Sequence, residues 1–104
     1  MIEMSNMEIE HEVEAFPKFI GVSTEPDGSR VFDLWAPERS GHVAIDQALG
    51  EYYADLSIQI ARYQGSDEFV FNVLTKIVAK KTMGHIEAGF LKGISQRAYS
   101  GSFN

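Results

Sequence analysis

Glutamates alternate strictly with other residues near the start of the chain, over residues 7 to 16. The acidic positions are Glu8, Glu10, Glu12 and Glu14, and the intervening ones are Ile9, His11, Val13 and Ala15. In a helix, glutamates at every second position would fall on opposite faces, whereas a β-strand places all four carboxylates on one side. We therefore expect a strand near residues 7–15, which ends before Pro17 because proline cannot donate a ladder hydrogen bond.

Two further segments with apolar residues flank a turn sequence. Residues 18–24 (KFIGVST) and 30–35 (RVFDLW) are separated by EPDGS. Proline presets φ, aspartate accepts local backbone hydrogen bonds and glycine tolerates a positive φ, so this sequence favours a tight turn. The pattern predicts an antiparallel hairpin and, together with the first strand, a small sheet of about three strands.

The hydrophobic period then changes to three and four residues, which is typical of helices. We expect helices near residues 42–64, 67–82 and 85–98. The apolar stripe of the first contains Val43, Ile45, Leu49, Tyr52, Leu56, Ile60 and Tyr63. Gly65 should close this helix, and Gly84 should end or bend the second. Alternatively, the second and third form one long bent helix.

Strands followed by helices indicate an α+β fold, in which the helices pack on one face of a small antiparallel sheet. A length of 104 residues suits a single domain spanning residues 1–104. The tails at 1–6 and 99–104 are expected to fray.

The composition restricts the chemistry. The chain has no cysteine, which excludes disulfides, thiolate nucleophiles and zinc sites that use sulfur. The sequence contains no nucleophile elbow, phosphate-binding loop, dinucleotide-binding loop or zinc-protease motif. It also has no signal-peptide pattern and no apolar stretch near the ~20 residues that span a bilayer. We expect a soluble cytoplasmic protein without cofactor, catalytic residues, metal ligands or membrane contact.

The net charge of −6 conceals two ends of opposite sign. Residues 1–40 have a net charge of −6, residues 41–68 have −4 and residues 69–104 have +4. The overall acidity argues against direct binding to nucleic acid. Alternate strand residues repeat at about 6.8 Å, close to the roughly 7 Å repeat of DNA phosphates. The four glutamates are therefore candidates for binding a basic partner, although charges on an edge strand also prevent aggregation.

Glycines in the third helical segment suggest a close contact with another helix. Each glycine inside a helix costs up to about 1 kcal/mol relative to alanine, so packing must compensate. The candidate association face contains Ile86, Gly89, Phe90 and Gly93. Its partner is either another helix of the same chain or a second copy across a two-fold axis.

These patterns favour a small non-enzymatic protein that binds other proteins and self-associates as a homodimer. An acidic inhibitor, or a nucleic-acid mimic directed against a nucleic-acid-binding protein, is the first alternative. A small enzyme is the second, with His42, Asp46 and Tyr53 around a cleft beside the first helix.

Overall fold

The computed structural model describes residues 17–100, so the strand expected near residues 7–15 lies outside the described residues. The described elements are β1 (Gly21–Thr24), β2 (Arg30–Asp33), α2 (Val43–Gln64), α3 (Glu68–Lys80) and α4 (His85–Ser100). The two strands form an antiparallel hairpin, and the three helices follow it and pack together. The prediction of an α+β fold is confirmed.

The turn between the strands forms as its sequence predicts. Gly28 adopts a φ of 88°, and its N–H donates to the Glu25 carbonyl at 2.9 Å. The Asp27 carboxylate accepts hydrogen bonds from the backbone N–H and the hydroxyl of Ser29. These bonds fix the hairpin register, in which Gly21 pairs with Asp33.

The helix ends separate the three helical segments. Gly65 closes α2 in the left-handed conformation with a φ of 70°, as expected. Lys81 closes α3 in the same conformation with a φ of 57°, and α4 begins after Gly84. The second and third segments are therefore two helices rather than one bent rod, and α4 extends two residues beyond its predicted end.

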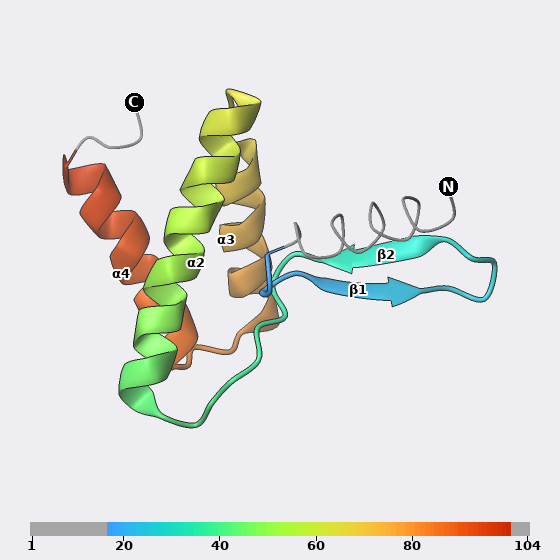
Figure 1. Cartoon of the computed structure of the whole chain (residues 1–104), viewed down its shortest axis with the longest axis horizontal. Helices are drawn as coiled ribbons and strands as arrows, with labels where there is room; N and C mark the ends of the chain where they lie inside the picture. The colour runs from blue at the N-terminus through green and yellow to red at the C-terminus, as the bar shows by residue number, and fades with distance from the viewer. Residues whose placement is uncertain (1–16, 101–104) are drawn as a thin grey trace, which may run out of the picture.

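The helices pack on one another more than on the hairpin. Figure 1 shows α2 between α3 and α4, with the hairpin projecting away from the helices. Each strand has four residues and spans roughly 13 Å. That length is too short to cover α2, whose 22 residues extend about 33 Å. The hairpin joins the helices at its base, where Phe19 and Trp35 are buried.

An aromatic cluster at this junction forms the centre of the core. The Phe19 ring lies 5.6 Å from the Trp35 ring and 5.2 Å from the Tyr53 ring, measured between centroids. Phe90 of α4 meets Trp35 edge to face at 5.0 Å. Such pairs stabilise by about 1 kcal/mol beyond the burial of their area. The cluster therefore fastens the hairpin to both α2 and α4.

The buried face of α2 differs from the apolar stripe seen in the sequence. Its buried residues include Gly50, Ala54, Ser57 and Ala61, whereas Ile45 is 51% exposed and Tyr52 is 57% exposed. Small side chains face the core because a neighbouring helix lies very close there. Part of the large apolar stripe is left at the surface.

Candidate functional site

Three glycines allow α2 and α4 to meet at backbone distance. A Cβ atom on Gly89 would overlap the Gln47 carbonyl oxygen and lie 2.9 Å from the Gln47 carbonyl carbon. A Cβ atom on Gly50 would lie 2.6 Å from the Phe90 amide nitrogen. At Gly93 it would lie 2.8 Å from the Ala54 Cβ. The glycines are needed because a side chain at these positions has no space.

The structure places the candidate association face inside this helix pair. Ile86 and Phe90 are fully buried, and Gly89 and Gly93 are buried beside them. Both glycines face α2 of the same chain. The close helix contact expected from the glycines is thus made within the chain, and a surface for association must be sought elsewhere.

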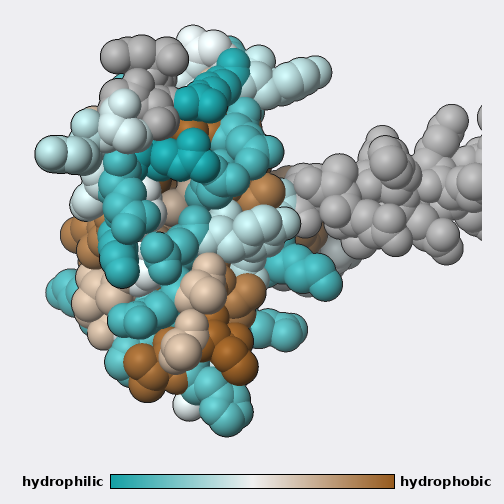
Figure 2. All heavy atoms as spheres, turned by 60° about the vertical axis from the view of Figure 1, so that its left-hand side comes forward, coloured by the Kyte–Doolittle hydropathy of each residue, from teal (hydrophilic) through white to brown (hydrophobic). Residues whose placement is uncertain are grey.

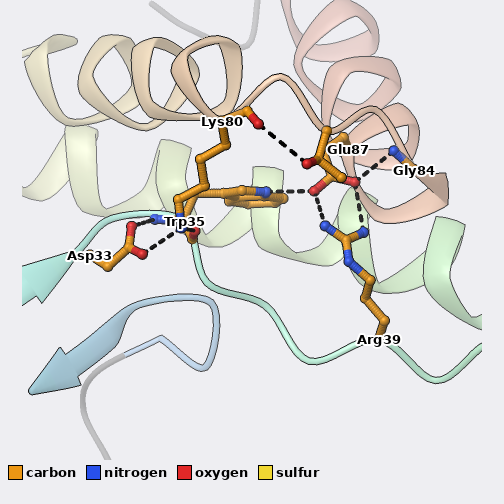
Figure 3. Close-up of polar contacts among 7 residues, drawn as sticks. Asp33, Trp35, Arg39, Lys80, Gly84 and Glu87 are labelled. Atoms are coloured by element: carbon orange, nitrogen blue, oxygen red, sulfur yellow. Dashed lines mark hydrogen bonds and ion pairs between the residues drawn. The ribbon is translucent and has the colours of Figure 1, made fainter.

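A buried carboxylate connects the loop after β2 to the start of α4. Glu87 is fully buried and accepts a hydrogen bond of 2.8 Å from the Trp35 indole N–H. The Arg39 guanidinium donates to both Glu87 oxygens at 2.8 and 2.6 Å, and the Gly84 backbone N–H donates at 2.9 Å. Figure 3 shows these groups converging on the carboxylate. A bidentate arginine and two further donors satisfy the buried charge.

These contacts determine the ionisation of Glu87. Burial raises the pKa of the carboxyl group, but the hydrogen bonds from Arg39, Trp35 and the backbone outweigh burial and hold the pKa at about 2. The group stays charged and paired, which suits a structural role rather than proton transfer. Sequence reasoning missed this cluster. The sequence feature that could have indicated it is Gly-His-Ile-Glu at residues 84–87. A glutamate at the third position of a helix often accepts a hydrogen bond from the backbone N–H of the residue that caps the helix.

The residues proposed for an enzyme site have separate environments. Asp46 accepts hydrogen bonds from the Ser40 N–H and hydroxyl at 3.0 and 2.7 Å, which lower its pKa. Tyr53 lies in the aromatic core, and burial raises the pKa of its phenol. His42 is exposed at the start of α2. The bonds of Asp46 fix the loop before α2, while Tyr53 packs beside Phe19.

The remaining charged candidates divide between described and undescribed parts of the chain. Glu8, Glu10, Glu12 and Glu14 lie outside the described residues. In the basic third, Lys80 binds the Asp33 carboxylate and the Trp35 carbonyl oxygen, and Arg97 pairs with Asp55. Within residues 17–100, no group of three or more histidine, aspartate or glutamate side chains is placed to hold a metal ion.

An apolar groove lies between α3 and α4 at the end of the molecule where α2 finishes. Its volume is about 660 Å³. Ile58 and Ala61 of α2 form its base, Val70 and Leu74 lie on the α3 side and Ile94 lies on the α4 side. The groove exists because α3 and α4 both pack on α2 and diverge from each other along it. Its lining suits an apolar side chain from a partner.

An exposed row of apolar residues on α3 borders the groove. Phe71 lines the groove and is 66% exposed, and Val78 lies two turns further along and is 73% exposed. A second apolar area lies at the start of α2, where Val43 and Ile45 are exposed. Figure 2 shows hydrophobic residues gathered at the end of the molecule where α2 begins. These are two separate exposed apolar areas, and exposed apolar surface is a candidate contact site for other molecules.

Comparison of the chain with protein-family models, with curated proteins and with solved structures finds no match in any of the three. Among residues 17–100, no helix combines the length and the apolar character needed to cross a membrane. The groove and the exposed apolar residues of α3 and α2 are therefore the features of the described residues that bear on function.

Proposed function

We propose that this chain is a small protein-protein interaction protein that acts without catalysis and self-associates. The observation that supports this proposal is the apolar groove together with the exposed row of α3 beside it. Covering Phe71 and Val78 with a partner removes apolar area from water and stabilises the complex by roughly 25 cal/mol for each Å² removed. A partner surface would cover both residues at once because they lie on one helix face.

The buried polar groups support a binding role over a catalytic one. The Glu87 carboxylate accepts hydrogen bonds from Arg39, Trp35 and Gly84. The Asp46 carboxylate accepts a hydrogen bond from the backbone N–H of Ser40 in the preceding loop. Each of these carboxylates therefore holds two segments of the chain together. The groove, in contrast, is mostly apolar, with Arg62 and Asp67 at its border.

The test is the mass of the native protein in solution as a function of concentration. We expect twice the chain mass of 11.6 kDa at high concentration. Phe71→Ser should shift the protein towards the single-chain mass, whereas Asn72→Ser, on an exposed neighbouring position, should leave the mass unchanged. A native protein that keeps the single-chain mass at all concentrations would refute self-association.

A further inference from the structure

We draw no further inference here: the strongest candidate, the apolar groove between α3 and α4, has Arg62 and Asp67 of opposite charge at its border, so nothing in the structure shows what covers it.

Discussion

Replacing Gly89 by alanine is the most direct test of the contact between α2 and α4. The added Cβ would overlap the Gln47 carbonyl oxygen and lie 2.9 Å from its carbonyl carbon. Both neighbours are backbone atoms, so a side-chain rotation cannot relieve the overlap and one helix must move away. Moving it loosens the packing of Ile86 and Phe90, which are fully buried on the same face.

Two opposing effects determine the size of the change. Alanine favours the helical state over glycine by up to about 1 kcal/mol. Overpacking a tight core costs about 1–3 kcal/mol, and more where backbone atoms are displaced. We expect Gly89→Ala to lower the free energy of unfolding by about 2 kcal/mol or more. That loss corresponds to a fall in melting temperature of roughly 10 °C for a domain of this size.

Urea and thermal unfolding followed by circular dichroism measure this change. Ala88→Leu is the matched control, because Ala88 is the exposed neighbour on α4 and its replacement should change stability by no more than about 0.5 kcal/mol. Gly93→Ala should fall between the two, since its Cβ would meet the Ala54 Cβ at 2.8 Å and would stay 3.3 Å from the nearest backbone atoms, those of Glu51. If Gly89→Ala melts at or above the native temperature, helix propensity dominates and the close contact does not exist.

Two further predictions concern the buried carboxylate. The folded pKa of Glu87 is about 2 against an ordinary value of 4.5, so its stabilisation is present above about pH 4.5 and is lost as the pH falls towards 2. The shift corresponds to about 3 kcal/mol. Between about pH 6 and pH 2, urea unfolding should show the native protein losing more stability than Glu87→Gln, which has no carboxylate to protonate. Trp35→Phe removes the indole N–H bonded to Glu87 and should cost about 2 kcal/mol; an unchanged urea midpoint for this variant would show that the bond contributes nothing.

The predictable parts of the fold are those whose signals are local. The Pro-Asp-Gly sequence specified the turn between β1 and β2, and the change of hydrophobic period specified the three helices to within a few residues. Gly65 closes α2 as its position predicted, because glycine reaches the left-handed conformation without steric cost. Each of these signals lies within a few residues of the structure that it determines.

The parts that were missed depend on contacts between distant segments. Glu87 and Arg39 are separated by 48 positions, and nothing near either residue indicates the other. The buried face of α2 was also misjudged, since its most hydrophobic stripe is partly exposed while Gly50 and Ala54 face the core. Close helix packing selects small side chains, so hydrophobicity alone does not identify the core face. The glycines of α4 gave the better signal, although they could not show which helix approaches them.

The distribution of these contacts predicts that the three helices differ in stability. α2 and α4 are held by backbone-distance glycine contacts and by the Glu87 cluster, whereas α3 buries Val70, Val73 and Ile77 and leaves its outer row exposed. Less buried area means a lower free energy of local opening, so amide hydrogens of α3 should exchange faster than those of α2 and α4. A dimer that covers the exposed row of α3 raises the free energy of local opening of that helix in particular. Exchange of the α3 amide hydrogens should therefore slow as protein concentration rises. Hydrogen exchange measured at two concentrations tests both statements. Equal exchange in all three helices would contradict the lower stability of α3, and a concentration effect confined to α2 would place the association surface elsewhere.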